Sequence, residues 1–330
     1  MFYDWLQRVW YANSISGVVL WPLAWIFGLL VWLRRWLYAK GWARSMAVAR
    51  PVIVIGNLTT GGTGKTPLVL WLAEQLRASG LRPGIVLRGY GGSARTPRRV
   101  SAAANAADVG DEAALLAARS GCPVAVGVDR VAAARLLEAE VDVVLADDGL
   151  QHLRLRRDLE IVVIDGERRF GNRRLLPAGP LREPLSRLES VDAVVVNGGS
   201  NGVGGVKMSL TGEQAVALIG GERRNLTSFA PGPVHALAAI GNPQRFFIML
   251  RQHRLNLIPH PLPDHHAFRR TDLEFGDSLP VLMTQKDAVK CAAFAERRHW
   301  YVPVDAVFDA GDAEQLLSLV LSAIEAKRGD

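Results

Sequence analysis

The sequence predicts an α/β protein with a doubly wound, mostly parallel sheet, a second and smaller α/β domain, and an N-terminal membrane helix. Three observations lead to this fold class. β-Branched runs alternate with helical patterns, a glycine-rich turn joins the first such run to a helix, and an apolar, basic segment precedes both. A chain of 330 residues also buries a full core, and its length favours two domains over one.

The N-terminal segment is the most apolar part of the chain. No charged residue occurs from Val9 to Leu33. As a helix this run spans about 37 Å at a rise of about 1.5 Å per residue, which exceeds a hydrocarbon core of about 30 Å. Aromatic residues lie toward both ends of the run: Trp5, Trp10 and Tyr11, then Trp32, Trp36, Tyr38 and Trp42. This pattern is typical of a membrane-spanning helix with aromatic belts.

The charge distribution supports the same interpretation. Residues 1–50 hold six basic residues and one acid, which accounts for +5 of the formal net charge of +7. Most of the basic residues follow the apolar run, so the positive-inside rule places everything after position 34 in the cytoplasm. Pro22 leaves a shallow interfacial helix open, and a soluble core helix is a third interpretation. A signal peptide is disfavoured, because no basic n-region precedes the run and no small-residue cleavage site follows it.

The stretch "VIVIGNLTTGGTGKTP" predicts a phosphate-binding loop. A short strand at 51–55 precedes the glycines, and a helical pattern begins near Lys65. Backbone N–H groups and the positive end of the helix dipole then point at one place, which suits a polyphosphate. Lys65 is expected to reach the β- and γ-phosphates, and the Thr66 hydroxyl to bind Mg²⁺. The expected nucleotide-binding residues of this P-loop NTPase-like fold are Thr59, Thr60, Gly61, Gly62, Thr63, Gly64, Lys65 and Thr66.

One position departs from the strict G-x-x-x-x-G-K-[ST] spacing. Thr59 stands where the first glycine is expected, and we expect Gly56 to relax the turn instead. The competing interpretation is a glycine-rich turn that only joins a strand to a helix. A partition-type regulatory ATPase is disfavoured, because Thr60 occupies the place of the signature lysine before the paired glycines.

Strand-like and helix-like segments alternate after this loop. The runs "PGIVL", "PVAVGV", "VDVVLA", "LEIVVID" and "VDAVVV" are typical of strands, and "DEAALLAARSG" and "RVAAARLLEAE" of helices. A Gly/Ser/Asn-rich break at 197–205 marks a boundary, and "VKMSLTGEQAVAL" after it predicts a hairpin. We therefore expect an anchor at 1–45, a P-loop domain at 46–197 and a smaller α/β domain at 198–330.

Paired acids end the strand "VDVVLA". Asp147 and Asp148 stand where a Walker B element lies beside a phosphate loop, and one of them is expected to bind Mg²⁺ directly or through water. Solvated turn residues are the competing interpretation, because acids are common at the ends of strands.

Asp111 and the pair His265 and His266 are candidates for acid–base chemistry. Asp111 begins a helical pattern, so a helix N-cap is the competing interpretation. The histidines lie in "PDHHAF", where exposed loop histidines without a catalytic role are the competing interpretation. No H-E-x-x-H spacing predicts zinc, and Cys122 and Cys291 form neither a metal motif nor a disulfide framework.

Eight arginines cluster near the ends of predicted strands. They are Arg154, Arg156, Arg157, Arg168, Arg169, Arg173, Arg174 and Arg182. Solvation or contact with anionic lipid headgroups is the main interpretation, and one or two are candidates to clamp a substrate phosphate. The sequence has no nucleic-acid recognition motif and no regular interleaving of basic and aromatic residues, so membrane lipids are the expected partner of its basic surface.

Eight motifs occur in one order from about Trp5 to Val304: "GNLTTGGTGKTP", "LRGYGG", "VGDEAALLA", "VGVDR", "ADDGLQH", "LLPAGPLREP", "PDHHAF" and "TQKDAVK". Together they resemble the tetraacyldisaccharide 4′-kinase family, the lipid A 4′-kinases of Gram-negative bacteria. That family commonly has Glu where this chain has Gln285, and it tolerates variation at the position of Thr59. Thr59 therefore does not argue against the phosphate loop.

The resemblance implies an enzyme of the bacterial inner membrane with its catalytic domains on the cytoplasmic side. It implies transfer of the γ-phosphate of ATP to the 4′-hydroxyl of a tetraacylated glucosamine disaccharide 1-phosphate, which forms lipid IVA. ATP and Mg²⁺ are the implied cofactors, and neither nucleic acid nor an obligate protein partner is expected.

The resemblance also assigns roles to residues. Lys65 and Thr66 handle phosphates and Mg²⁺, Asp147 and Asp148 bind the metal, and Asp111 is the base, paired with a histidine. A lone aspartate is a weak base, so we expect this histidine to orient the carboxylate and share the proton during transfer. That histidine is His265, and the implied substrate contacts are Arg130, Gln151 and Arg182. A membrane-tethered P-loop ATPase that switches protein partners remains the rival class, which Thr60 and "PDHHAF" disfavour.

Overall fold

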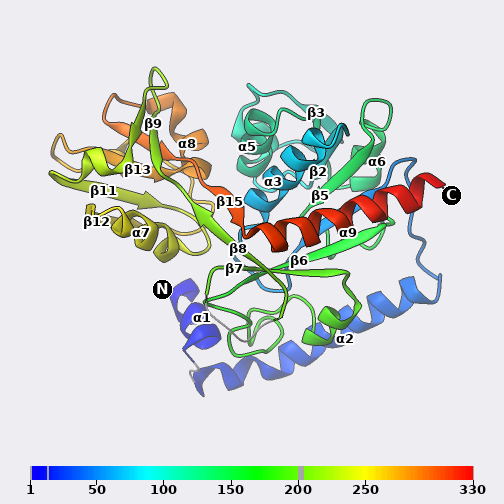
Figure 1. The fold of residues 1–330 in the computed structure, drawn as a ribbon. Coiled ribbons are helices and arrows are strands. Elements are labelled where there is room, and N and C mark those ends of the chain that lie inside the picture. Colours follow the sequence, from blue (N-terminus) through cyan, green and yellow to red (C-terminus); the bar gives the residue numbers. More distant parts are fainter. Residues whose placement is uncertain (1, 13–14, 200–203, 330) are drawn as a thin grey trace.

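The computed structural model describes residues 2–12, 15–199 and 204–329, and these residues form two sheets (Figure 1). Within them, the larger sheet has nine strands in the order β15-β8-β7-β6-β1-β5-β2-β4-β3. The smaller sheet has six strands in the order β10-β9-β14-β13-β11-β12. The predicted α/β class with a mostly parallel sheet is confirmed.

The larger sheet is parallel except at its edges. Its strands are β1 (Val52–Gly56), β2 (Pro83–Leu87), β3 (Arg98–Val100), β4 (Val124–Val126), β5 (Val143–Asp147), β6 (Leu159–Asp165), β7 (Ala193–Asn197), β8 (Val206–Thr211) and β15 (Asp305–Phe308). Only the β3–β4 and β15–β8 pairs are antiparallel. The register places Ile55 of β1 beside Asp147 of β5, so the loops that follow these two strands leave the sheet at one edge.

Helices cover both faces of the larger sheet. They are α3 (Lys65–Ala78), α4 (Ala106–Val109), α5 (Asp111–Arg119), α6 (Arg130–Arg135) and α9 (Ala310–Gly329). Ile53 and Ile55 of β1 pack in one buried cluster with α3, α5 and α9, whereas Val52 and Val54 pack in the opposite cluster with α6. Every residue of β1 is therefore buried, as the central strand of a doubly wound sheet requires.

The smaller sheet comes from the chain between β8 and β15. Its strands are β9 (Gln214–Ala217), β10 (Arg223–Asn225), β11 (Pro233–Ala238), β12 (Asn256–Pro261), β13 (Val281–Thr284) and β14 (His299–Val302). Its helices are α7 (Pro243–Gln252), α8 (Gln285–Cys291), η3 (Leu226–Phe229), η4 (Arg270–Leu273) and η5 (Ala292–Phe294), and η2 (Leu185–Ser190) precedes β7 of the larger sheet. Figure 1 shows the two sheets side by side, with α9 in red returning across the larger one.

The expected hairpin at 206–218 is wrong. β8 pairs with β7 in the larger sheet, whereas β9 pairs with β10 and β14 in the smaller one. Residues 206–211 and 305–329 therefore belong with the larger sheet, although the sequence assigned them to the smaller domain. We propose a larger domain of 46–211 with 305–329, and a smaller domain inserted at 212–304. The expected break at 197–205 lies partly outside the described residues.

The N-terminal segment forms α1 (Phe2–Tyr11), η1 (Ile15–Leu20) and α2 (Trp21–Ala39) instead of one helix from Val9 to Leu33. The stretch Gly17–Ala39 is long and apolar enough to cross a membrane, with a mean hydropathy of 1.7 over a window of which 11% is buried. Pro22 lies in the first turn of α2, where its missing N–H leaves no helical bond unmade, so it begins the helix without kinking it.

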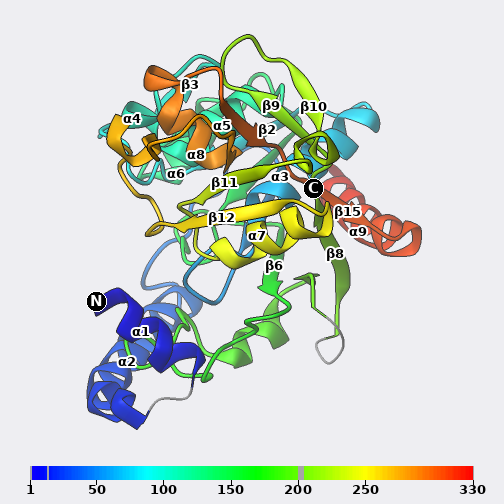
Figure 2. The ribbon, with the colours of Figure 1, turned by 90° about the vertical axis from the view of Figure 1, so that its left-hand side faces the viewer.

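Helix α1 packs against the protein. Trp10 is only 6% exposed, and its indole Nε1 donates to the carbonyl oxygen of Pro177 at 2.9 Å. The backbone N–H of Asn172 donates to the carbonyl oxygen of Trp10. Trp10 is therefore a packing residue and not part of an aromatic belt. Figure 2 shows α1 beside α2, on the side of the larger sheet away from α9.

Candidate active site

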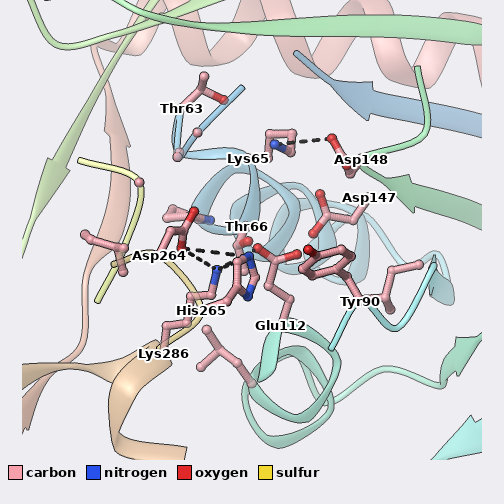
Figure 3. Close-up of a pocket in the computed structure, with 18 of the residues that line it drawn as sticks. Thr63, Lys65, Thr66, Tyr90, Glu112, Asp147, Asp148, Asp264, His265 and Lys286 are labelled. Carbon is pink, nitrogen blue, oxygen red and sulfur yellow. Dashed lines mark hydrogen bonds and ion pairs between the residues drawn. The ribbon is translucent and has the colours of Figure 1, made fainter. Parts of the chain in front are cut away.

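A cleft of about 880 Å³ opens between the two proposed domains, at the carboxyl ends of the parallel strands. The larger domain lines it with the phosphate loop, the loops after β2 and β5, and α5. The smaller domain contributes residues near 240–249, 264–265 and 284–286. This is where open α/β sheets bind their ligands. Figure 3 shows the side chains of both domains pointing into this cleft.

The phosphate loop has the geometry that its glycines permit. Gly61 and Gly64 have φ values of 101° and 95°, and Gly64 caps α3, so the helix begins at Lys65. Thr59 is buried and bridges the segment at Leu181. The expected role of Gly56 is wrong: a Cβ there would lie 2.5 Å from Cβ of Leu150, so Gly56 makes room for the loop after β5.

Amide side chains hold the phosphate loop from both sides. Asn57 Nδ2 donates to the carbonyl oxygen of Thr59 at 2.7 Å, and Asn197 Nδ2 donates to that of Thr63 at 2.9 Å. The hydroxyls of Thr60 and Thr63 are buried and have no hydrogen-bond partner among the described residues. Buried hydroxyls without partners are costly, and phosphate oxygens are partners that fit them. The loop is therefore suited to a polyphosphate.

Asp147 lies at the end of β5 and is the most deeply buried acid of the cleft. Neither of its carboxylate oxygens has a hydrogen-bond partner among the described residues. Burial, together with the charge of Glu112, raises the pKa of Asp147. An unpartnered carboxylate in a cleft that Thr66 also lines fits a divalent cation, because Mg²⁺ takes oxygen ligands.

Asp148 has a different environment. Its Oδ1 lies 3.3 Å from Lys65 Nζ and 3.1 Å from an Arg182 guanidinium nitrogen. Although burial opposes them, these charges hold the pKa of Asp148 well below its usual range. Arg130 is 4% exposed and donates to the backbone carbonyl oxygen of Asp148 at 2.6 Å. Arg130 and Arg182, which the sequence suggested as substrate contacts, thus both hold the loop of Asp148.

Gln151 connects the cleft to helix α2. Its Nε2 donates to Asn57 O at 3.2 Å and to Glu183 Oε1 at 3.0 Å. The other oxygen of Glu183 accepts a hydrogen bond from Arg35 of α2 at 2.9 Å. Helix α2 is therefore joined to Gln151, which lines the cleft, by the buried carboxylate of Glu183, a contact that the sequence did not reveal.

The structure brings Asp111 and His265 together from different domains. His265 Nδ1 lies 3.2 Å from Asp111 Oδ2, and His265 has a φ of 60°, a strained value for a residue other than glycine. The hydrogen bond to Asp111 raises the pKa of His265, and against the effect of burial it lowers the pKa of Asp111. Asp111 is the first residue of α5, whose cap is Gly110. His266 instead contacts Asp272 at 3.0 Å.

Three charged residues complete this side of the cleft, and sequence reasoning gave none of them a role. Lys286, the second residue of α8, lies 3.1 Å from Glu112 Oε1 and 3.6 Å from Asp264 Oδ1. Figure 3 shows all three around His265. The available signal was "TQKDAVK", in which a charged pair follows the strand Val281–Thr284 after one intervening residue, Gln285.

The segment 166–183, here called the arginine-rich loop, packs against the N-terminal helices. The Arg174 guanidinium lies 4.0 Å from the ring centroid of Trp21, and that of Arg168 lies 5.2 Å from the ring of Tyr11. Arg168 also donates to the carbonyl oxygen of Gly241 at 2.5 Å. Arg168 and Arg174 therefore contact protein groups. Five of the eight clustered arginines are nevertheless exposed, as expected for most of them: Arg154, Arg156, Arg169, Arg173 and Arg174.

Comparison with known proteins identifies the family. The family described as tetraacyldisaccharide-1-P 4′-kinase matches residues 16–324. The tetraacyldisaccharide 4′-kinase of Nitrosococcus oceani is 52% identical, covering 98% of this chain and 96% of its own, and that of Methylobacillus flagellatus is 48% identical, covering 98% of each.

A solved structure agrees with these relatives. It is the "apo" form of LpxK from Aquifex aeolicus in complex with ATP, with a TM-score of 0.77 and 25% identity, covering 94% of this chain and all of its own. The family match spans both sheets, the cleft between them and all of α2. The chain belongs to the tetraacyldisaccharide-1-phosphate 4′-kinase family.

Proposed function

We propose that this protein transfers the γ-phosphate of ATP to the 4′-hydroxyl of a tetraacylated glucosamine disaccharide 1-phosphate, which forms lipid IVA. Family membership supports this reaction. The observation that carries it is one cleft that holds the phosphate loop, the unpartnered Asp147 and the Asp111–His265 contact. A kinase needs these three parts: a phosphate cradle, a cation site and a base for the acceptor.

The nucleotide occupies the phosphate loop. The backbone N–H groups of 61–66 and the N-terminus of α3 receive the phosphates, and Lys65 exchanges its contact with Asp148 for phosphate oxygens. Thr66 and Asp147 are the residues that would hold Mg²⁺, which neutralises charge on the phosphates when it is bound.

The acceptor meets the γ-phosphate on the side of Asp111. The sugar oxygen forms its bond to phosphorus while the bond from phosphorus to the leaving oxygen of ADP breaks. The hydroxyl proton passes to the Asp111 carboxylate, which His265 orients at 3.2 Å. Both domains contribute to this step, so the acceptor has to be held between them.

The acyl chains of the acceptor stay in the membrane. Helix α2 exposes an apolar surface that fits the bilayer. Its C-terminal part is basic, with Arg34 and Arg35 in the helix and Lys40 at the C-cap. We place the helix in the bacterial inner membrane with the cleft on the cytoplasmic side. Arg35 then fixes the distance between the membrane and the cleft through Glu183.

The direct test supplies the purified protein with ATP, Mg²⁺ and the disaccharide 1-phosphate lipid in detergent micelles. The lipid is expected to gain the mass of one phosphate at the distal sugar, and ADP is expected to form in equal amount. An Asp111→Asn variant is the matched control, because it keeps the shape of the site without the base. ADP formation that does not depend on lipid, with the lipid mass unchanged, would favour an ATPase.

A further inference from the structure

Lys286 lies at the point where the charged groups around His265 converge. Its Nζ is 3.1 Å from Glu112 Oε1, 3.4 Å from His265 Nε2, 3.6 Å from Asp264 Oδ1 and 3.9 Å from Asp111 Oδ2. Asp264, His265 and Lys286 belong to the smaller domain, whereas Asp111 and Glu112 begin α5 of the larger one. The lysine therefore bridges the two domains beside the base.

We propose that Lys286 is a positioning residue that holds His265 in the tautomer protonated at Nδ1, so that His265 orients Asp111 but does not receive the sugar proton. The catalytic part of this statement rests on the proposed kinase function. The tautomer itself is a property of the protein alone and stands independently of the substrate.

The argument begins with what each nitrogen faces. A lysine ammonium has three donors and no acceptor, so a favourable contact with His265 Nε2 requires the lone pair of that nitrogen. The ring proton then resides on Nδ1 and is donated to Asp111 Oδ2 at 3.2 Å. The opposite tautomer turns an N–H toward the ammonium and a lone pair toward the carboxylate, which makes both contacts repulsive.

The ammonium remains charged in this position. Lys286 is largely buried, and burial alone lowers the pKa of an amine, but the charges of Glu112 and Asp264 raise the pKa of Lys286 above its ordinary value. The pair with Glu112 also fastens α8 to α5, and these two helices pack against each other. His265 is thus held by the same lysine that joins its domain to the base.

The proton balance follows from this tautomer. Nδ1 of His265 already carries a proton, so it has no lone pair for a second one. The proton of the sugar hydroxyl stays on Asp111 during transfer and leaves to solvent afterwards. This differs from the sequence-based expectation that the histidine shares the proton. Here the histidine donates one hydrogen bond to the Asp111 carboxylate and thereby fixes the orientation of that carboxylate.

The tautomer is measured by nitrogen NMR of protein labelled with ¹⁵N-histidine, in which a protonated and an unprotonated ring nitrogen have well-separated shifts. The His265 signals are assigned by their loss in His265→Gln. The native protein is expected to show protonated Nδ1 and unprotonated Nε2. Lys286→Met is expected to give a mixture of tautomers or an imidazolium. If the methionine variant does not fold, Lys286→Gln removes the charge with a side chain that retains donors.

Lys290→Met is the matched control. Lys290 Nζ lies 3.8 Å from Asp111 Oδ2, almost the distance of Lys286, and the structure records no contact between Lys290 and the His265 ring among the described residues. Loss of either lysine removes a similar charge from Asp111, but only loss of Lys286 is expected to change the tautomer. The same change of tautomer in both variants would show that it follows from the loss of a nearby positive charge and not from the contact with Nε2, which would overturn the proposal.

The kinetic readout is the pH profile of kcat/KM. The groups facing His265 are Asp111 and Glu112 of α5, Asp264 of its own loop, Lys286 of α8 and the Tyr90 ring, 4.9 Å away between centroids. Lys286 lowers the pKa of His265, so Lys286→Met is expected to move the acidic limb to higher pH, with kcat reduced more than KM is raised. Lys286→Arg is expected to restore part of kcat.

Two results separate this proposal from the proposed function. Protonated Nε2 in the native protein would overturn the tautomer whatever the enzyme does with lipid. An Nδ1 tautomer that depends on Lys286, in a protein that does not phosphorylate the lipid, would leave the tautomer standing and overturn the lipid kinase reaction.

Discussion

Lys65 is the residue on which nucleotide chemistry in this cleft depends most directly. Its ammonium pairs with Asp148 at 3.3 Å and is released when phosphate oxygens arrive. Replacement by alanine is expected to reduce phosphate transfer by about 10²–10³-fold, because an oriented positive charge is lost from the transition state. Arg182 still pairs with Asp148 in that variant, so the fold is expected to survive.

Single-turnover transfer and circular dichroism check the Lys65→Ala variant together. Lys207→Ala, which removes a lysine exposed on β8, is the control and is expected to behave like the native protein. Normal turnover in Lys65→Ala would mean that the loop is only a turn between β1 and α3.

Asp147 makes the Mg²⁺ requirement depend on pH. Burial raises the pKa of its carboxyl group, so protons compete with the cation at and below neutral pH. The Mg²⁺ concentration for half-maximal activity is therefore expected to fall as pH rises through the raised pKa. Asp147→Asn is expected to abolish that dependence and to raise the requirement.

Asp142→Asn is the control for Asp147. A hydrogen bond from Arg82 lowers the pKa of Asp142 to about 2, so this surface carboxylate is ionised throughout the range of the experiment. Its loss is expected to leave the pH dependence unchanged. An unaltered dependence in Asp147→Asn would assign the titration to another group.

Asp111 and His265 are expected to act as one unit. Asp111→Ala and His265→Ala should each reduce turnover strongly, and the double variant should be little worse than the poorer single one, because residues that act together lose activity non-additively. His266→Ala is the control, because His266 contacts Asp272 of its own loop. Single-turnover phosphorylation compares these four variants with the native protein. Multiplicative losses would indicate two independent roles.

At the scale of elements, we propose two roles for α2, contact with the membrane and support of the cleft, and different variants separate them. Trp25, Leu29 and Leu30 are 77%, 61% and 58% exposed, whereas Arg35 reaches inward to Glu183. Replacing the three apolar residues by serine is expected to lower activity on lipid in bilayers and leave ATP affinity unchanged, because only the encounter with the membrane is lost.

Arg35→Ala is expected to give the converse result. It should remain bound to vesicles but turn over more slowly, because Glu183 and Gln151 lose their anchor. Vesicle flotation and lipid phosphorylation measure the two properties separately. Equal lipid kinase activity in the triple serine variant and the native protein would show that α2 does not serve the encounter.

The sequence predicted those elements whose signal is local. The strand, glycine turn and helix at 52–78 follow one another directly, so periodicity and glycine chemistry were sufficient. It failed at β8 and β9, because "TGEQ" suits a turn but the antiparallel partner of β8 is β15, about a third of the chain away. Pairing between strands depends on tertiary packing, which a single sequence does not report.

The residues of the candidate site also divide into those that local sequence patterns predict and those that only the folded structure brings together. Lys65, Asp147 and Asp148 follow from motifs next to strand ends, and Asp111 and His265 from resemblance. The contacts Arg35–Glu183 and Lys286–Glu112 join residues 148 and 174 positions apart, and neither pair has a local pattern that distinguishes it from a solvated charge. Those contacts were therefore visible only in the folded chain.

At the scale of the whole molecule, the smaller domain rests on the phosphate loop through backbone atoms. A Cβ on Gly241 would overlap the backbone nitrogen of Gly62, and backbone cannot move aside as a side chain can. Gly241→Ala is therefore expected to push the domains apart, weaken the Asp111–His265 contact and reduce turnover, with a smaller effect on the unfolding temperature.

Gly232→Ala is the matched control for Gly241→Ala. A Cβ on Gly232 meets no atom within 4 Å, so that variant is expected to behave like the native protein. Lipid phosphorylation and small-angle X-ray scattering compare the two. Full activity in Gly241→Ala would show that the close approach of the domains is not needed for transfer.

The insertion of the smaller domain also determines when, during synthesis, the core of the larger domain can be completed. Leu316, Val320 and Ile324 of α9 are buried in the same cluster as Ile53 and Ile55 of β1. On the ribosome, the apolar α2 emerges early and can enter the bilayer, whereas α9 is made only after the whole inserted domain. With α2 in the membrane as we propose, the nascent protein is bound there before the buried core around β1 is complete. A chain truncated within α9 is expected to lose that core but to remain associated with the membrane through α2.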